Sequence, residues 1–195
     1  MDMQGARRLA VTQQQAWDAL NDPEVLKTCI PGCDKVEATG ENQYAIGMAV
    51  KIGPVAARFN GKILLADVLP PNSYTLSFEG QGGAAGFGKG SAKVSLAPPA
   101  EGAGCELSYT AHAQVGGKIA QVGQRLVDGV ARQMADDFFR RFDEEMQRRY
   151  PQAYAAEAAL PPAAPAPAPA RRMPVWVWVL FAAVVLLAIL LLVRR

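Results

Sequence analysis

Few residues of this chain have the type and spacing that catalysis or metal binding requires. His112 is the only histidine among the 195 residues, and it falls on the predicted outer face of the sheet, so no convincing Ser–His–Asp arrangement can be assembled around it. A metal site would also have to do without a second histidine. The three cysteines, Cys29, Cys33 and Cys105, match neither a C-x-x-C redox pair nor half of a zinc site. The sequence therefore predicts no catalytic residue, no metal ligand and a protein that is not an enzyme.

Two other motifs resemble functional sites but have simpler interpretations. Gly83 to Gly90, GAAGFGKG, is close to a phosphate-binding loop, but Gly90 replaces the Ser or Thr that would hold magnesium. A strand pattern also follows it, whereas a phosphate loop opens a helix. The carboxylates at 136–137 and 143–145 alternate with arginines, which is typical of a solvated helix face with ion pairs four residues apart.

The charge is distributed unevenly along the chain. Residues 1–150 contain 16 Lys and Arg residues against 17 Asp and Glu residues, a net charge of −1. Residues 151–195 add one glutamate, Glu157, and four arginines at 171–172 and 194–195, which brings the formal charge of the whole chain to +2. This pattern does not favour a nucleic-acid-binding surface.

Those arginines flank the longest apolar run, residues 175–193, VWVWVLFAAVVLLAILLLV. As a helix, 19 residues span roughly 28 Å, close to the ~30 Å hydrocarbon core of a bilayer. Trp176 and Trp178 lie at one end, where indole rings prefer the membrane interface. The run predicts one transmembrane helix. Because no signal-peptide pattern opens the chain, we expect a single-pass protein of the cell inner membrane with a cytoplasmic N-terminal domain.

The composition predicts three parts: a folded domain at 1–150, a flexible linker rich in Pro and Ala at 151–174, and the membrane span at 175–193. Within the first part, Thr12 and Gln15 form a capping-box pattern before a short helix, and a second short helix covers 24–29. Alternating residues then predict five antiparallel strands, and a period of three to four predicts a long helix. The first strand is expected at 4–11, the later strands at 44–52, 57–65, 74–79, 87–96 and 105–115, and the long helix at 118–150.

This order predicts an α+β fold in which an antiparallel sheet packs against a long C-terminal helix. Several positions on the predicted inner face are Gly or Ala, which either leave an apolar cavity or let the helix pack closer. The candidate ligand-binding residues are inward positions of this pattern: Tyr44, Met48, Phe59, Phe78, Gly90, Ala92, Tyr109, Ala111, Val122, Leu126, Val130 and Met134.

The order of elements resembles the helix-grip fold of the START-like (SRPBCC) superfamily. Motifs over about residues 3–148 resemble more closely the family of carbon monoxide dehydrogenase G subunits: CIPGC at 29–33, KIGPV at 51–55, FNG at 59–61, GFGKG at 86–90, VGG at 115–117 and FF at 138–139. The resemblance implies a membrane recruitment factor for a molybdenum hydroxylase of the carbon monoxide dehydrogenase type. It also implies a respiratory quinone, such as menaquinone or ubiquinone, as a ligand in the helix-grip cavity, with no covalent cofactor.

Two alternatives remain open from the sequence. The domain would be a pure adaptor or assembly factor if its interior were filled, because only its outer surface would then be available. It would be an enzyme on an apolar substrate, as some START-like cyclases are, if polar groups lined the cavity. The inner face offers mainly Tyr44, Tyr74 and Tyr109 for that purpose.

Overall fold

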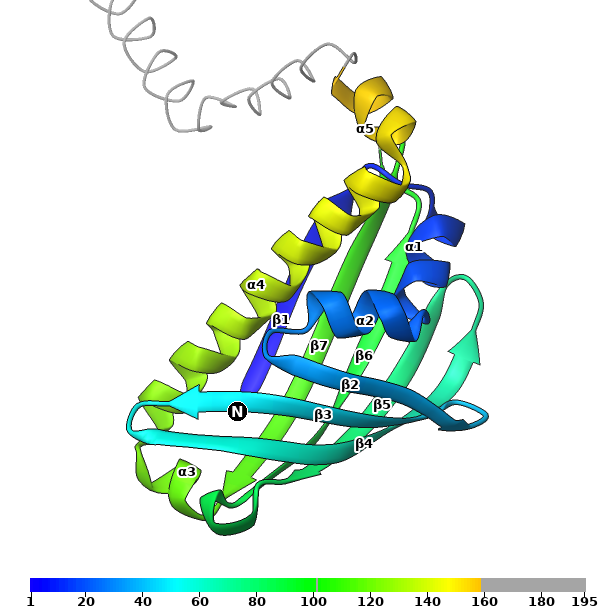
Figure 1. The fold of residues 1–195 in the computed structure, drawn as a ribbon. Helices are drawn as coiled ribbons and strands as arrows, with labels where there is room; N and C mark the ends of the chain where they lie inside the picture. Colours follow the sequence, from blue (N-terminus) through cyan, green and yellow to red (C-terminus); the bar gives the residue numbers. More distant parts are fainter. Residues whose placement is uncertain (101, 159–195) are drawn as a thin grey trace, which may run out of the picture. The chain divides into compact units, whose positions relative to one another are not determined.

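The computed structural model describes residues 1–100 and 102–158. Seven strands form one antiparallel sheet in the order β1-β7-β6-β5-β4-β3-β2 (Figure 1). Their bounds are β1 (Asp2–Leu9), β2 (Cys33–Gly40), β3 (Gln43–Ile52), β4 (Val55–Leu69), β5 (Ser73–Gln81), β6 (Phe87–Ala97) and β7 (Cys105–Gly116). The predicted meander is confirmed, because each strand from β2 to β7 pairs with the next along the chain.

The sheet contains one strand that the sequence did not predict. β2 has register shifts between Cys33 and Lys35 and between Ala38 and Gly40, so its side chains do not alternate regularly. Bulges of this kind disrupt the period of two on which strand prediction depends. The first strand also begins and ends two residues earlier than expected, and it pairs with β7 from Asp2 to Leu9.

Two short helices follow β1, as predicted. Helix α1 (Gln13–Leu20) begins at the Thr12 cap, and Thr12 and Gln15 form the expected capping box. Helix α2 (Pro23–Cys29) begins at Asp22, whose side chain accepts a hydrogen bond from the backbone N–H of Glu24. Proline at the first helical position is favourable because it has no N–H to leave unsatisfied.

The predicted helix over 118–150 is wrong in one respect, because it is interrupted. Helix α3 (Lys118–Gln121) ends before Gly123, and α4 (Gln124–Arg149) begins after it. Gly123 has a φ of +100°, a conformation that residues with a Cβ rarely adopt. The inward positions predicted within α4 also differ, because they are spaced by four residues and rotate by about 40° per step around a helix of 3.6 residues per turn. Leu126, expected inside, is 41% exposed, whereas its neighbour Val127 is 3% exposed.

Residues 151–158, which the sequence assigns to the linker, form helix α5 (Pro151–Ala158) instead. The hydroxyl of Tyr154 donates a hydrogen bond to the carboxylate of Asp143 on α4, 2.5 Å away, and so ties the two helices together. The remainder of the predicted linker and the predicted span at 175–193 lie outside the described residues. Over 1–100 and 102–158, none of the helices combines the length and apolar character that a membrane crossing requires.

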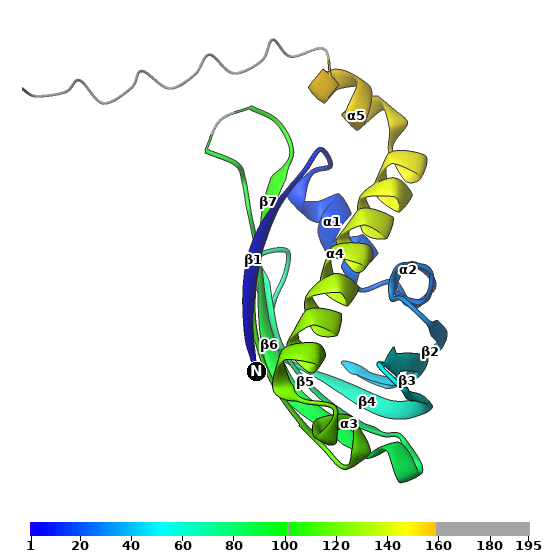
Figure 2. The same ribbon diagram turned by 90° about the vertical axis from the view of Figure 1, so that its left-hand side faces the viewer.

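The sheet curves strongly, and α4 runs along its concave side (Figure 2). β1, β7, β6 and β5 form one wall, and β4, β3 and β2 turn over to form the floor. Helices α1 and α2 lie on the same side of the sheet as α4, and α2 packs against α4. The interior is therefore enclosed by the sheet on one side and by three helices on the other.

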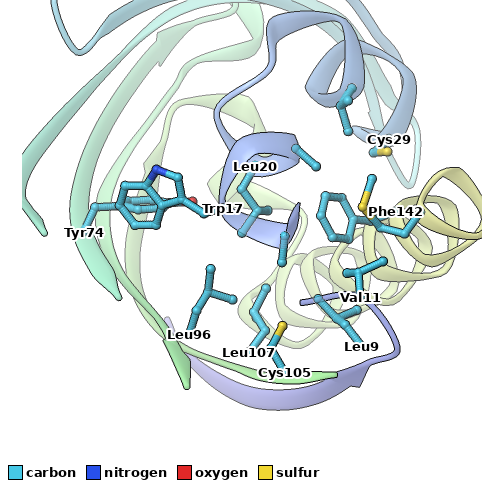
Figure 3. Packing of buried hydrophobic residues seen from close by; sticks show 14 residues of the cluster. Leu9, Val11, Trp17, Leu20, Cys29, Tyr74, Leu96, Cys105, Leu107 and Phe142 are labelled. Atoms are coloured by element: carbon cyan, nitrogen blue, oxygen red, sulfur yellow. The ribbon is translucent and has the colours of Figure 1, made fainter. Parts of the chain in front are cut away.

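Buried apolar residues fill one end of this interior, where α1, α2, β7 and the last turns of α4 meet (Figure 3). We call this region the closed end. Phe142, Met146 and Val25 have no exposed surface there, and Leu107 is 1% exposed. The closed end comprises Leu9, Val11, Ala16, Trp17, Ala19, Leu20, Val25, Cys29, Tyr74, Leu96, Cys105, Leu107, Phe142 and Met146.

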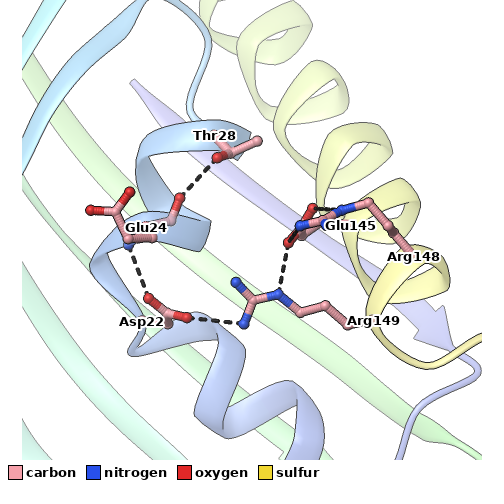
Figure 4. A network of polar contacts seen from close by, with 6 residues as sticks. All are labelled: Asp22, Glu24, Thr28, Glu145, Arg148 and Arg149. Carbon is pink, nitrogen blue, oxygen red and sulfur yellow. Dashed lines mark hydrogen bonds and ion pairs between the residues drawn. The ribbon is translucent and has the colours of Figure 1, made fainter.

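A polar network fixes α2 to the last turn of α4 beside the closed end (Figure 4). Arg149 donates hydrogen bonds to Asp22 at 3.0 Å and to Glu145 at 2.7 Å, and Arg148 donates to Glu145 at 2.6 Å. Glu145 is only 7% exposed, which departs from the solvated face that the sequence predicts at 143–145. Hydrogen bonds from Arg148 and then Arg149 lower the pKa of Glu145, against the opposing effect of its burial.

Candidate functional site: an apolar cavity between the sheet and the helices

An apolar cavity of about 230 Å³ lies between the sheet and the helices, next to the closed end. Strands β2 to β7 contribute inward-facing residues, and α1, α2 and α4 contribute the opposite wall. The lining residues are Leu20, Leu26, Ile30, Val36, Tyr44, Ile46, Ile63, Leu65, Tyr74, Leu76, Ala92, Val94, Leu107, Tyr109, Phe138 and Phe139.

The lining contains no charged side chain within the described part of the chain. Its only side-chain polar groups are the hydroxyls of Tyr44, Tyr74 and Tyr109. An ion cannot be held in such surroundings without a large desolvation cost. The cavity can therefore accommodate a neutral, mainly apolar group, with at most a few hydrogen bonds from phenols.

Tyr74 lies where the cavity meets the closed end. It is 6% exposed, and its ring packs edge-on against Trp17 with centroids 5.6 Å apart and planes at 76°. Burial, reinforced by the nearby Tyr44, raises the pKa of Tyr74. The phenol is thus neutral at physiological pH and keeps its proton available for donation.

Aromatic rings form the opposite side of the cavity. Tyr109 stacks on Phe139 with centroids 5.2 Å apart, and Phe138 packs on both Phe139 and Phe142. The guanidinium of Arg7 on β1 lies 5.8 Å from the centroid of the Phe139 ring. These contacts connect the cavity to the edge where β1 faces α4.

A second hollow, of about 460 Å³, lies at this β1–α4 edge. Tyr109 lines both the cavity and this hollow, whose other residues include Arg7, Arg132 and Asp136. An ion pair between Arg7 and Asp136 spans the edge. Side chains of both signs surround the hollow, in contrast to the uncharged cavity.

The structure places three of the twelve predicted ligand-binding residues in the lining, Tyr44, Ala92 and Tyr109. Phe78 and Gly90 pair with each other and keep the inward alternation, but they border another hollow, whose residues include Lys62 and Lys89. The remaining predicted residues lie outside the cavity lining: Met48, Phe59, Ala111, Val122, Leu126, Val130 and Met134. Those on α3 and α4 precede the part of the helix that reaches the cavity, at Phe138 and Phe139.

The small residues of the sheet have a different role from the one expected. A Cβ on Gly61 would lie 2.4 Å from the carbonyl oxygen of Glu79, and a Cβ on Gly90 would lie 2.2 Å from that of His112. These glycines permit close approach of neighbouring strands and do not leave empty space. Among the small inward residues, Ala92 is the one that borders the cavity.

Sequence reasoning missed the helical part of the lining. Leu20 and Leu26 come from short helices, and Ile30 directly follows α2; the few apolar residues there do not reveal which of them face a cavity. Phe138 and Phe139 are part of a motif that the chain shares with the family, but they are not among the ligand-binding positions predicted from the sequence. Sheet residues such as Leu65 and Val94 follow the inward alternation, so their direction was predictable although their contact with the cavity was not.

The side chains that could act as nucleophiles or bases lie outside the cavity, and each is either paired or buried. His112 is exposed on the outer face of the sheet, and its Nδ1 lies 2.6 Å from the carboxylate of Asp2. Cys29 and Cys105 are buried, and burial raises the pKa of each thiol to about 11. Over 1–100 and 102–158, no group of His, Cys, Asp and Glu side chains has the arrangement of a metal site.

The fold and the cavity together place the protein in a known structural class. A curved antiparallel sheet around a long helix, with an apolar cavity between them, is the helix-grip architecture, which commonly binds hydrophobic ligands. A structure of the Zhui aromatase/cyclase from a Streptomyces species shares the fold, with a TM-score of 0.57 at 12% identity over 76% of this chain and 94% of that one. A Thermus thermophilus protein is similar as well, with a TM-score of 0.58 at 14% identity over 76% and 99% of the two chains.

The family follows from sequence. The model of the family described as the G subunit of carbon monoxide dehydrogenase (CoxG) matches residues 5–147, and the chain belongs to this family. The structure of a conserved protein from Geobacillus kaustophilus is similar, with 34% identity and a TM-score of 0.70 over 76% of this chain and 96% of that one. Among curated proteins, no match was found.

Proposed function

We propose that this protein is a non-catalytic, membrane-anchored recruitment factor for a molybdenum hydroxylase of the carbon monoxide dehydrogenase type. In this proposal the cavity binds a respiratory quinone, so that the soluble enzyme is held near the acceptor of its electrons. The observation that carries the proposal is the uncharged cavity of about 230 Å³ between sheet and helices. The partner is inferred from the name of the family.

The size of the cavity bears on which part of a quinone it holds. Sites for drug-sized ligands usually enclose about 300–1,000 Å³. The volume here, about 230 Å³, suits a one- or two-ring group with a few attached carbons, and not a whole isoprenoid tail. Each 100 Å² of apolar ligand surface removed from water contributes about 2.5 kcal/mol. Useful affinity can thus arise without charged contacts.

Attachment to the membrane rests on the sequence of residues 175–193, whose length and apolar character suit one crossing. The proline- and alanine-rich stretch before it is typical of an extended tether. A tethered domain with an apolar cavity can take up a lipid-soluble carrier from the bilayer and present it to a docked enzyme.

The test is to fill the cavity and measure quinone binding by the full chain in lipid nanodiscs. Ala92→Leu adds three carbons at the lining, whereas Ser91→Leu adds a similar bulk on the outer face of the same strand. We expect Ala92→Leu to weaken binding of a short-chain quinone about tenfold, since overfilling a packed space costs about 1–3 kcal/mol. Isothermal titration calorimetry measures the dissociation constants.

Ser91→Leu serves as the matched control and is expected to bind as the unchanged protein does. Equal binding by all three proteins would contradict a ligand site in this cavity. Failure of the unchanged protein to bind any quinone, together with its recovery from membranes without lipid, would favour the pure adaptor.

A further inference from the structure

The cavity lining contains three tyrosine hydroxyls, those of Tyr44, Tyr74 and Tyr109, and none of them has a hydrogen-bond partner within the described residues. Tyr74 is the most deeply buried of the three. Tyr74 is 6% exposed, and no hydrogen bond joins its hydroxyl to any other group of residues 1–100 and 102–158. No side-chain oxygen or nitrogen in this part of the chain is both fully covered and unpaired. The hydroxyl oxygen of Tyr74 therefore keeps some accessible surface, and Tyr74 lines the cavity.

Because the Tyr74 hydroxyl keeps little accessible surface and bonds no protein group, its partial loss of hydration costs up to about 1–3 kcal/mol. Phenylalanine would fill the same position and pack against Trp17 without that cost. Tyrosine is thus a poor choice for packing alone. It becomes a good choice once the cavity holds a molecule with a hydrogen-bond acceptor at the matching place.

We propose that the Tyr74 hydroxyl donates a hydrogen bond to a carbonyl oxygen of the ligand, so that a quinone binds with its ring at the Tyr74 side of the cavity and its tail directed away. This inference rests on the proposed function and adds to it the orientation of the ligand and the residue that selects a carbonyl.

The rest of the lining supports a neutral acceptor. Among residues 1–100 and 102–158, no Lys, Arg or His borders the cavity, so a carboxylate or phosphate would be buried there without a counter-charge from these residues. Burial also keeps the phenol protonated, as the raised pKa of Tyr74 shows, and a protonated phenol can donate. The carbonyl of a quinone meets both conditions.

Tyr150, the residue that follows α4, provides a control outside the cavity. It packs against the closed end but does not belong to the cavity lining. Tyr150→Phe therefore removes a phenol hydroxyl without changing any residue of the lining.

The experiment compares two probes of the same ring size on the full chain in nanodiscs. One is a naphthoquinone methylated at both free ring positions, which prevents addition of thiols, and the other is the corresponding dimethylnaphthalene. We expect Tyr74→Phe to bind the quinone roughly three- to tenfold more weakly, the effect of one neutral hydrogen bond. Binding of the hydrocarbon is expected to be unchanged, and Tyr150→Phe is expected to bind both probes as the unchanged protein does.

Two further readouts separate hydrogen bonding from a change in folding. The infrared C=O stretch of the bound quinone should shift to lower frequency in the unchanged protein, and part of this shift should be absent in Tyr74→Phe. Without ligand, Tyr74→Phe should melt at the same temperature as the unchanged protein or slightly above it. The reason is that the hydroxyl of Tyr74 bonds no protein group when the cavity is empty.

Full quinone affinity and an unaltered C=O stretch in Tyr74→Phe would overturn the role of Tyr74, while the proposed function would stand. If neither probe bound to the unchanged protein, both the function and the orientation would be contradicted. The two failures are therefore distinguishable.

Discussion

The closed end and the cavity use similar apolar side chains, yet one is filled and the other is not. Phe142 belongs to the closed end and has no exposed surface, whereas Phe138, one helical turn earlier, is half-buried and borders the cavity. The rings of these two residues lie 5.9 Å apart and nearly parallel. Chemical type therefore does not separate the two regions.

The difference lies in what faces each part of α4. At Phe142, helices α1 and α2 and the strand residue Leu107 meet around the ring (Figure 3). Phe138 instead borders the cavity of about 230 Å³, across which the inward residues of β2 to β7 lie. The comparison indicates that the short helices stabilise the fold at one end, and that this leaves the adjoining space available for a ligand.

The largest expected effect is on stability. Phe142→Ala should lower the free energy of unfolding by about 3–5 kcal/mol, because truncation leaves a cavity within close packing. Phe138→Ala removes the same atoms beside a space that is already empty and should cost less, about 1–2 kcal/mol. Urea unfolding of the solubilised chain, followed by near-ultraviolet circular dichroism, measures both values. Equal losses would show that the two regions are packed alike.

Much of this arrangement could be predicted from the sequence because it depends on local patterns. The alternation along β3 to β7 and the capping box at Thr12 specified the meander and α1. The inner and outer faces of these strands were also correct, and His112 lies outside as expected. Such features depend on neighbouring residues, so a single sequence contains them.

What could not be predicted depends on long-range geometry. Whether an inward residue touches the cavity is decided by the curvature of the sheet and by the path of α4. The predicted inward positions on α4 are spaced by four residues, which rotates them by about 40° per step around a helix of 3.6 residues per turn, so Val127 is buried instead of Leu126. Gly90 looked like empty space but is required by the backbone of the adjacent strand. Three of twelve site positions were therefore placed in the lining.

A smaller effect is expected at the polar network beside the closed end. Glu145→Gln weakens the hydrogen bonds from Arg148 and Arg149 and should lower stability by about 1 kcal/mol at neutral pH, a modest value because Arg148 is exposed. The pKa of Glu145 is lowered on folding, so the unfolded chain binds the extra proton. The stabilisation that the Glu145 carboxylate contributes is thus fully present at pH values above its pKa in the unfolded chain. It is lost as the pH falls through its lower pKa in the folded protein.

We therefore expect the stability difference between the unchanged protein and Glu145→Gln to be constant at neutral pH and to shrink below about pH 4.5. Urea titrations at several pH values measure this dependence. Phe142→Ala serves as the control because it changes no titratable group. Its loss of stability is expected to be the same at every pH. If the stability difference between the unchanged protein and Glu145→Gln persisted at low pH, the effect would come from packing and not from the charge of Glu145.

The smallest effects come from two ion pairs that compare the regions directly. Asp22 and Arg149 join α2 to α4 beside the closed end, with side chains 32% and 33% exposed. Arg7 and Asp136 span the edge near the cavity, with side chains 48% and 68% exposed. Exposed pairs contribute about 0–1 kcal/mol, because water and salt screen them and long side chains lose entropy.

Double-mutant cycles with Asp22→Asn and Arg149→Gln, and with Arg7→Gln and Asp136→Asn, should give coupling energies of about 0.5–1 kcal/mol for the first pair and below about 0.5 kcal/mol for the second. The order follows from exposure, since the better-covered pair is screened less. Raising the salt concentration should reduce the Arg7–Asp136 coupling further. A stronger coupling at the β1–α4 edge would mean that this edge is held as tightly as the closed end, and the contrast between the two regions would then rest on packing alone.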